Sequence, residues 1–562
     1  MSNSSRLLLA IVFLSIAALA QIATPTSSPA TKTESSGYVG NQACAGCHSS
    51  IFEAYTKTSM AHASGPALEN LIPADFVHQK SGVHYRIFSE DGADAKGKVW
   101  LDFERPNDPE VKGRRQLLYY IGSGRRGRSY LFATDGFLFE SPVNWYTDRH
   151  LWDMAPAYGN ASQIPMTLPA FTSCMHCHFS GVKAPAPGTE NRYPIPPFTG
   201  AGVTCEACHG PGAAHMNGGA IINPAKLDPV RRDAICMQCH LEGKSAVERV
   251  GQHIYNFRPG QQLSDYIHYF VFADQQGPGL GAVSQFEALA QSVCKKKSGD
   301  AMSCTSCHDS HAEPSAGERV AYYRQKCLAC HGGKFETKHY PKQPDCTSCH
   351  MPAALSTDVA HTEVTDHRIP MRPPISAQLL QDVVAQPSLP RLVRFPEAQK
   401  GEDDVRDLAL AWESVADRGM TAAAPEAEHR LLSAIAKSPN DPVLLSALGY
   451  CAQKRGDLKR AGEWYEKALA IDPTLIDAET NLGILDVKRG NTREGIKLWE
   501  DAFRRAPGKS RIGMNIARVL CEAGQPDSAR DYVLRVLQFD PDLPEAKSMM
   551  KNLNSSAPKC GQ

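Results

Sequence analysis

The sequence has no excess of either charge and, beyond its first twenty residues, no long apolar run. Its 562 residues include 60 lysines and arginines against 60 aspartates and glutamates. This balance gives no support for binding to nucleic acid or to an anionic membrane, because both depend on a basic surface. The apolar stretches after residue 20 are too short to cross a bilayer. We therefore expect no nucleic-acid partner and no membrane span in the rest of the chain.

Cysteine, in contrast, is plentiful and is arranged in one repeated motif. The spacing Cys-x-x-Cys-His occurs seven times and uses 14 of the 18 cysteines. It is the attachment site of c-type haem: two thiols bond to the porphyrin, and the histidine is the proximal iron ligand. The attachment cysteines are Cys44, Cys47, Cys174, Cys177, Cys205, Cys208, Cys236, Cys239, Cys304, Cys307, Cys327, Cys330, Cys346 and Cys349. The proximal histidines are His48, His178, His209, His240, His308, His331 and His350. The sequence therefore predicts seven covalently bound haems c.

Zinc ribbons and a disulfide framework are two other interpretations of paired cysteines. Zinc sites also use Cys-x-x-Cys pairs, but they do not require a histidine after every second cysteine. A disulfide framework needs no histidine at all. All seven motifs end in histidine, which favours haem over both alternatives.

Residues that follow the motifs are candidates for the sixth iron ligand. A haem that only transfers electrons has two axial ligands, whereas an open position allows a substrate to bind. The candidates are Met60, His215, His311, His339, His361 and His367. No candidate comes soon after the motifs that end at His178 and His240. If the protein has an open haem, we expect it at one of these two.

The N-terminus predicts export. Arg6 precedes an apolar run that ends in Ala18-Leu19-Ala20, a small-residue pattern typical of signal-peptide cleavage. We interpret residues 1–20 as a cleaved signal peptide, with an uncleaved anchor helix as the alternative. Residues 21–37 form a polar linker. The protein is therefore expected in the periplasm or outside the cell.

A 34-residue period marks the C-terminal part of the chain. Glycine recurs with this spacing at Gly456, Gly490 and Gly524, and proline recurs at Pro439, Pro473, Pro507 and Pro541. Paired helices with this period are typical of tetratricopeptide repeats, which stack into a solenoid and usually bind a protein. We predict the repeats in residues 403–555 and expect them to fold on their own.

These patterns predict three regions and a mainly α fold. Residues 38–371 contain every haem motif and are expected to be helix and loop around stacked haems. A small β insertion is expected at about residues 80–150, where apolar and polar residues alternate and Asp135-Gly136 signals a hairpin. Residues 372–402 form a proline-marked connector to the helical repeats.

The β insertion carries a cluster of arginines that allows two interpretations. The cluster consists of Arg114, Arg115, Arg125, Arg126 and Arg128. Arginines of this kind are either solvated or paired with haem propionates. The alternative is a binding site for an anionic substrate.

The motifs "GVTCEACHGPGAAH", "MSCTSCHDSHAEP" and "DVAHTEVTDHRIP" resemble the exported multihaem cytochromes with C-terminal tetratricopeptide repeats of environmental bacteria. The haem core is similar to that of the tetrahaem electron carriers of ammonia oxidation, in the group that includes hydroxylamine oxidoreductase and pentahaem nitrite reductase. In that family a distal histidine follows the first haem in the pattern Trp-x-x-Ser-x-His-Ala. Met60 occupies the matching position here, so the resemblance implies Met60 rather than His62 as the ligand.

The resemblance implies electron transfer by the seven haems, with the repeats binding a redox partner protein. We expect an electron carrier rather than an enzyme. One alternative is a reductase of a small nitrogen or sulfur oxyanion at one open haem, although the Cys-x-x-Cys-Lys motif of typical nitrite reductases is absent. The other alternative is a repeat scaffold in which the haems only relay electrons.

Overall fold

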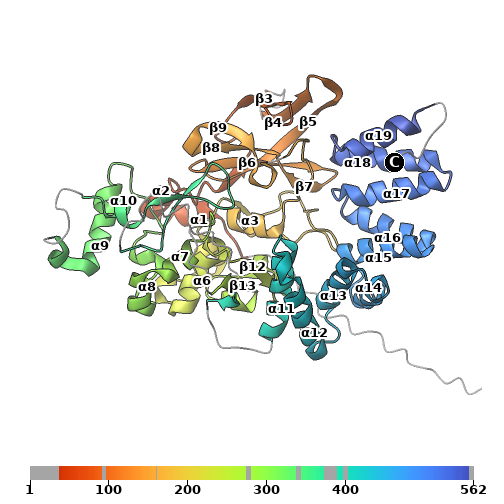
Figure 1. The fold of residues 1–562 in the computed structure, drawn as a ribbon. Coiled ribbons are helices and arrows are strands. Elements are labelled where there is room, and N and C mark those ends of the chain that lie inside the picture. Colours follow the sequence, from red (N-terminus) through yellow and green to blue (C-terminus); the bar gives the residue numbers. More distant parts are fainter. Residues whose placement is uncertain are drawn as a thin grey trace, which may run out of the picture. The chain divides into compact units, whose positions relative to one another are not determined.

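Alternating apolar and polar residues between Ser64 and Met154 form the largest sheet of the computed structural model (Figure 1). The structure describes residues 37–90, 97–159, 161–273, 280–336, 344–371, 389–396 and 403–555. Within these ranges the sheet has nine antiparallel strands. They are β1 (Ser64–Pro66), β2 (Ala74–His78), β3 (Val83–Glu90), β4 (Lys98–Arg105), β5 (Asp108–Ile121), β6 (Gly127–Thr134), β7 (Phe137–Glu140), β8 (Val143–Tyr146) and β9 (Leu151–Met154).

The strands follow the order β2-β3-β4-β5-β6-β8-β9, with β1 paired to β5 and β7 paired to β6. The alternation buries one face: Val83, Tyr85 and Ile87 of β3 are fully buried. The predicted hairpin at Asp135-Gly136 is confirmed, because both residues have positive φ (51° and 80°) and join the paired strands β6 and β7.

This sheet corrects the expected fold class. The prediction of a mainly α protein with a small β insertion is only partly right, because the strands start at Ser64 and further strands lie among the haem motifs. A three-stranded sheet joins β12 (Ser245–Glu248), β13 (Ile267–Phe272) and β16 (Leu392–Phe395), so the segment predicted as a connector contributes a strand. Two further hairpins pair β10 (Phe179–Ser180) with β11 (Gly200–Ala201), and β14 (Ala353–Leu355) with β15 (Glu363–Thr365).

Short helices and long loops carry the haem motifs. The helices of this part are α1 (Asn41–Ala45), α2 (Ser49–Tyr55), α3 (Thr172–His178), α4 (Glu206–His209), α5 (Ala213–Met216), α6 (Pro229–His240), α7 (Gln285–Gln291), α8 (Val293–Ser298), α9 (Arg319–Glu336) and α10 (Cys346–His350). None of the helices in the described ranges is long and apolar enough to span a bilayer. The predicted signal peptide and most of the predicted linker lie outside the described residues.

Paired helices of similar length form the C-terminal part, as the 34-residue period predicts. They are α11 (Asp403–Asp417), α12 (Ala424–Lys437), α13 (Pro442–Arg455), α14 (Leu458–Ile471), α15 (Ile476–Arg489), α16 (Thr492–Arg505), α17 (Ser510–Glu522), α18 (Pro526–Phe539) and α19 (Pro544–Leu553). Gly456, Gly490 and Gly524 follow α13, α15 and α17 with φ of 87°, 91° and 76°. Glycine is favoured there because the chain turns out of the helix in a left-handed conformation.

The repeats share apolar cores with the rest of the chain at two points. Trp412 and Ala409 of α11 pack in one cluster with Val247, Phe270 and Leu392 of the three-stranded sheet. Phe539, the last residue of α18, is 1% exposed in the core of the nine-stranded sheet. The repeats are therefore packed onto both sheets rather than held apart as a separate module.

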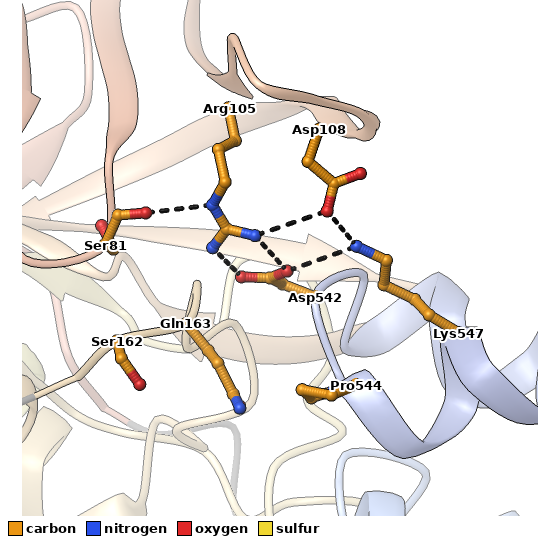
Figure 2. Close-up of a pocket in the computed structure, with 8 residues that line it drawn as sticks. All are labelled: Ser81, Arg105, Asp108, Ser162, Gln163, Asp542, Pro544 and Lys547. Carbon is orange, nitrogen blue, oxygen red and sulfur yellow. Dashed lines mark hydrogen bonds and ion pairs between the residues drawn. The ribbon is translucent and has the colours of Figure 1, made fainter.

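Ion pairs surround the second point of contact (Figure 2). Arg105 of β4 binds both carboxylate oxygens of Asp542, and Lys547 of α19 pairs with Asp108 at 2.5 Å. Asp542 is 2% exposed, and its carboxylate also accepts a hydrogen bond from the Ile164 backbone amide. The cavity of about 490 Å³ beside these groups is therefore lined by charges that already neutralise one another.

Candidate haem-binding sites

Every haem motif lies on a helical turn, which explains its spacing. The backbone N–H of His48 donates to the Cys44 carbonyl at 2.9 Å, and His209 donates to Cys205 at 3.0 Å. The motifs that end at His178, His240 and His350 lie within α3, α6 and α10. Residues three and four apart share one side of a helical turn. Two thiols and one imidazole are therefore presented together, as covalent haem attachment requires.

The motif cysteines are free to react. All fourteen are free thiols, and each is at least partly exposed. Across the described ranges, no group of three or more His, Cys, Asp and Glu side chains is arranged to hold a metal ion. A zinc ribbon needs four such ligands around one point. The helical turn of each motif fits haem attachment.

Five of the proximal histidines contact protein groups through Nδ1. Nδ1 of His209 donates to the Ile222 carbonyl oxygen at 2.8 Å, and Nδ1 of His350 donates to Pro370 at 2.8 Å. The same contact joins His178 to Ala63 at 3.2 Å, His240 to Gln285 at 3.1 Å and His308 to the Tyr323 hydroxyl at 3.3 Å. Histidines that bind metals are typically fixed in this way by an outer partner.

Burial favours the form of the imidazole that can bind a metal. It lowers the pKa of His178 and is also the main cause of the lowered pKa of His308. A lowered pKa keeps the ring neutral at physiological pH, and the neutral imidazole is the metal-binding form.

Three proximal histidines each face a second, nearly parallel imidazole. The ring centroids of His209 and His311 are 6.0 Å apart, with 6° between the ring planes. The separation is 6.5 Å with 15° for His48 and His215, and 6.3 Å with 25° for His308 and His367. A metal–imidazole bond is about 2 Å long, so two rings on opposite sides of one ion have centroids about 6 Å apart. The three centroid separations are close to that spacing.

The facing rings come from residues that the sequence analysis names as distal candidates. Nδ1 of His215 donates to the Gly219 carbonyl at 3.1 Å, and Nδ1 of His367 donates to Thr365 at 2.9 Å. Both distal candidates thus contact the protein through Nδ1, the nitrogen that metal-binding histidines typically use for an outer partner. Each of these distal candidates follows a later motif than the one that contains the proximal histidine it faces. No pattern in the sequence predicts this pairing.

The other distal candidates differ from these three. His215 faces the first proximal histidine, and Met60 stays a prediction for this position. Nε2 of His62 donates to the Thr56 carbonyl at 2.7 Å. Nε2 of His361 is 2.9 Å from the Asp153 carboxylate, beside the ring of Tyr146. His339 lies outside the described residues.

His176, inside the second motif, also uses Nε2 for a protein contact. It lies 2.9 Å from Gln238 in the fourth motif, and burial lowers its pKa to about 4. The histidines thus fall into two groups, according to which ring nitrogen contacts the protein. His62, His176 and His361 engage Nε2, whereas His215 and His367 engage Nδ1.

Thiols of different motifs lie side by side. Burial, followed by the neighbouring Cys44, raises the pKa of Cys205 to about 11. Burial and then Cys346 raise the pKa of Cys327 to about 11. Cys177 also lies beside Cys239, and Cys236 beside Cys304. The attachment sites therefore form a connected series rather than isolated points.

The arginine cluster of the sheet is occupied by protein groups. Arg128 is 3% exposed, lies over the Tyr120 ring at 4.0 Å and donates to the Asn70 carbonyl at 2.6 Å. Three others pair with carboxylates: Arg114 with Asp102 and Glu90, Arg125 with Glu313, and Arg126 with Asp148. Arg115 donates to the Gln538 carbonyl in α18 at 2.8 Å. The cluster is structural, and these contacts do not favour an anionic substrate.

Comparisons with known families match four segments of the chain. The family described as cytochrome c554 and c-prime matches residues 147–210, and the doubled CXXCH motif matches residues 297–336. Tetratricopeptide repeats match residues 442–475 and 486–553. These matches support c-type haem attachment and confirm the C-terminal repeats.

Individual proteins resemble parts of the chain. Multiheme cytochrome MtrA of Shewanella baltica (strain OS185) is 25% identical over 198 residues, which are 31% of this chain and 56% of that protein. The chain thus spans about half the length of this relative. Among solved structures, MamA from Desulfovibrio magneticus RS-1 is 19% identical, with a TM-score of 0.24, over 26% of this chain and 84% of its own. PilF of Pseudomonas aeruginosa is 24% identical, with a TM-score of 0.25, over 27% and 69%.

Proposed function

We propose that this multihaem c-type cytochrome, which carries tetratricopeptide repeats at its C-terminal end, is an exported electron carrier with seven haems. Bound haem supplies an iron that accepts and donates single electrons. The chain supplies the attachment thiols, the axial imidazoles and the spacing between neighbouring sites. Residues 38–371 are the proposed haem region, and residues 403–555 are the proposed repeat region that binds a redox partner.

The observation that carries this proposal is a regular exchange of histidines between motifs. His215 follows the third motif and faces His48 of the first. His311 follows the fifth motif and faces His209 of the third. His367 follows the seventh motif and faces His308 of the fifth. Two imidazoles on one iron leave no open position, which favours electron transfer over catalysis.

This exchange also supports a continuous path for electrons. A distal histidine that comes directly after one motif and serves another holds the two haems close together. The adjacent thiols Cys44 and Cys205, Cys177 and Cys239, and Cys236 and Cys304 favour the same short spacing. The proposed haem core is thus of the packed kind that the resemblance to the hydroxylamine oxidoreductase group implies.

The test is the stoichiometry and redox behaviour of the purified protein. Intact-mass spectrometry after denaturation should show seven covalent haems, and a spectroelectrochemical titration should reduce all of them reversibly. Electron paramagnetic resonance should show mostly low-spin iron. Markedly fewer haems, with zinc in their place, contradict the proposal.

A reductase is the second candidate function, and it depends on His178 and His240. Both rings are anchored through Nδ1, yet neither faces a second imidazole within the described residues. An open iron there allows a small nitrogen or sulfur oxyanion to bind. A high-spin signal that shifts on addition of nitrite or hydroxylamine supports this alternative, and a spectrum without high-spin iron excludes it.

A further inference from the structure

One buried carboxylate lies inside the third haem motif, although covalent attachment of haem does not need it. Glu206, between the two cysteines of that motif, is 2% exposed. Its Oε1 accepts hydrogen bonds from the backbone amides of Val39 at 2.9 Å and Gly212 at 2.8 Å, and its Oε2 accepts one from Gly40 at 2.9 Å. A buried carboxylate is costly unless it is hydrogen-bonded, and these amides offset that cost. The side chain therefore joins two segments that lie far apart in the sequence.

The two segments that meet at Glu206 lead to the two rings of one histidine pair. The first segment directly precedes α1, which carries a thiol of the motif that ends at His48. The second contains Gly212 and directly precedes α5, which carries His215. The rings of His48 and His215 face each other with 6.5 Å between their centroids. One carboxylate thus contacts both segments from which this facing pair extends.

The segment before α1 has two further anchors that do not involve Glu206. The Asn41 side-chain oxygen accepts a hydrogen bond from the Cys205 backbone amide at 2.9 Å. The Arg258 guanidinium lies over the Tyr38 ring, 5.9 Å from its centroid, within the range of a cation–π contact. These contacts remain when Glu206 is replaced. A change at Glu206 should therefore loosen the histidine pair without detaching either motif.

The space around Gly212 is filled by the carboxylate and by the first segment. A Cβ added at Gly212 would lie 2.9 Å from Cγ2 of Val39 and 3.3 Å from Oε1 of Glu206. The backbone of Gly212 has φ −86° and ψ −12°, a conformation that alanine also adopts. Alanine at this position would therefore press the two segments apart while it leaves the carboxylate in the protein.

We propose that Glu206 is a positioning residue for the axial ligation of the first haem. It holds the segment of His215 against the segment of His48, so that the two rings stay on opposite sides of one iron. A hydrogen bond to a charged acceptor shifts an equilibrium by about tenfold or more. Loss of the carboxylate should thus increase the fraction of molecules in which His215 has left the iron. The inference rests on the proposed electron transfer and names a residue that keeps one haem closed.

Cyanide titration of the oxidised full-length holoprotein measures this fraction, because cyanide binds ferric haem at an open position. A site that is open for part of the time binds with an affinity reduced by the open fraction. The variants are Glu206→Ala, Glu206→Gln and Gly212→Ala, and His215→Ala is the reference for a site that is always open. The control, Glu248→Ala, removes another carboxylate that accepts a backbone hydrogen bond, from Ile254 at 2.9 Å.

Glu206→Ala should bind cyanide at one haem at least about tenfold more tightly than the wild type does. Glu206→Gln should gain less, because its single carbonyl oxygen can still accept from two of the amides. Gly212→Ala should also bind cyanide more tightly, and the control should bind it as the wild type does. The double variant Glu206→Ala/His215→Ala should match His215→Ala, because Glu206 acts through His215.

Four results would overturn the proposal. They are unchanged cyanide binding in Glu206→Ala and Gly212→Ala, an equal gain in Glu248→Ala, unchanged binding in His215→Ala, or a double variant that binds cyanide more tightly than His215→Ala. If Glu206→Ala does not retain haem, Glu206→Gln and Gly212→Ala decide by the same criteria. The haem count and the reversible reduction of the wild type do not depend on these results, so a failure here is distinct from a failure of the proposed electron transfer.

Discussion

The haem region and the repeats are stabilised in different ways. Helices α11 to α18 have 13 to 15 residues, and most present an apolar face to their neighbours. In the haem region the nine-stranded sheet has a large apolar core, but the segments that carry the motifs have less: α4 and α5 have four residues each, and the cluster around Leu280, Ala288 and Val364 has only these three buried members. Short helices and small clusters do not bury enough apolar surface to be stable alone.

We expect haem to be part of the core around the motifs, whereas the repeats have cores made of side chains alone. Covalent haems bring large apolar surfaces between the loops, and the thioether bonds fix the chain to them. The repeats need only their neighbours, since each pair of helices buries its face on the next pair. Changes to haem attachment should therefore damage the first region far more than the second.

Loss of one attachment site should have the largest effect. Cys205→Ala/Cys208→Ala removes both thiols of the third motif, and it also frees His311, which faces His209 there. We expect the loss of one haem by intact mass and a large drop in the thermal stability of the haem absorbance. Far-ultraviolet circular dichroism should retain most of the helical signal, which comes from the repeats.

Cys451→Ala is the control for this prediction, because Cys451 is a partly buried free thiol of α13 outside any motif. It should leave the haem content unchanged. An equal loss of helix and haem in the double variant would show that the two regions unfold together.

The haem region and the repeats meet at Phe539, so this residue tests how much their contact contributes to stability. Its ring contacts Phe137 and Phe139 of β7 at centroid distances of 6.3 and 5.8 Å. Phe539→Ala should lower the free energy of unfolding by about 3–5 kcal/mol, since it leaves a cavity in the sheet core. Leu534→Ala, at a 53% exposed position of the same helix, should cost little. Chemical denaturation of both variants measures the difference.

A partly buried carboxyl beside this junction should make stability depend on pH. Burial raises the pKa of Asp540 to about 6, and its carboxylate accepts a hydrogen bond from Ser510 at 3.0 Å. Because the folded pKa lies above the unfolded one, the folded state binds more protons between about pH 4 and 6. Stability should fall as the pH rises through this window, by at most about 3 kcal/mol.

Asp540→Asn should remove that part of the pH dependence, and urea denaturation at several pH values checks it. Asp527→Asn, at an exposed position of α18, is the control and should keep the wild-type profile. A wild-type profile that is flat between pH 4 and 6 contradicts the assignment to Asp540.

Covalent chemistry and periodicity could be predicted from the sequence because both are local. The Cys-x-x-Cys-His spacing fits one helical turn, and the glycines of the 34-residue period fit helix ends. The pairing of His48 with His215 joins residues 167 positions apart, and nothing in the sequence specifies it. Phe539 has the same pattern as any core residue of a repeat, so its place in the sheet was equally hidden. Met60 is predicted from a resemblance at a single position, and the ring contact of His48 with His215 offers a second candidate for the same iron.

We expect the smallest effect on stability from replacing the proposed ligand of the first haem. The same change should have the most specific effect on the spectrum. His215→Ala removes an exposed side chain, so it should change the free energy of unfolding little. It should leave the iron beside His48 with one imidazole and add a high-spin signal to the electron paramagnetic resonance spectrum. Met60→Ala and His62→Ala are the comparisons, and both should keep the low-spin signals, since Nε2 of His62 is engaged by Thr56. If Met60→Ala alone produces the high-spin signal, the ligand implied by the family resemblance is the correct one, and the facing of His48 and His215 is packing rather than ligation.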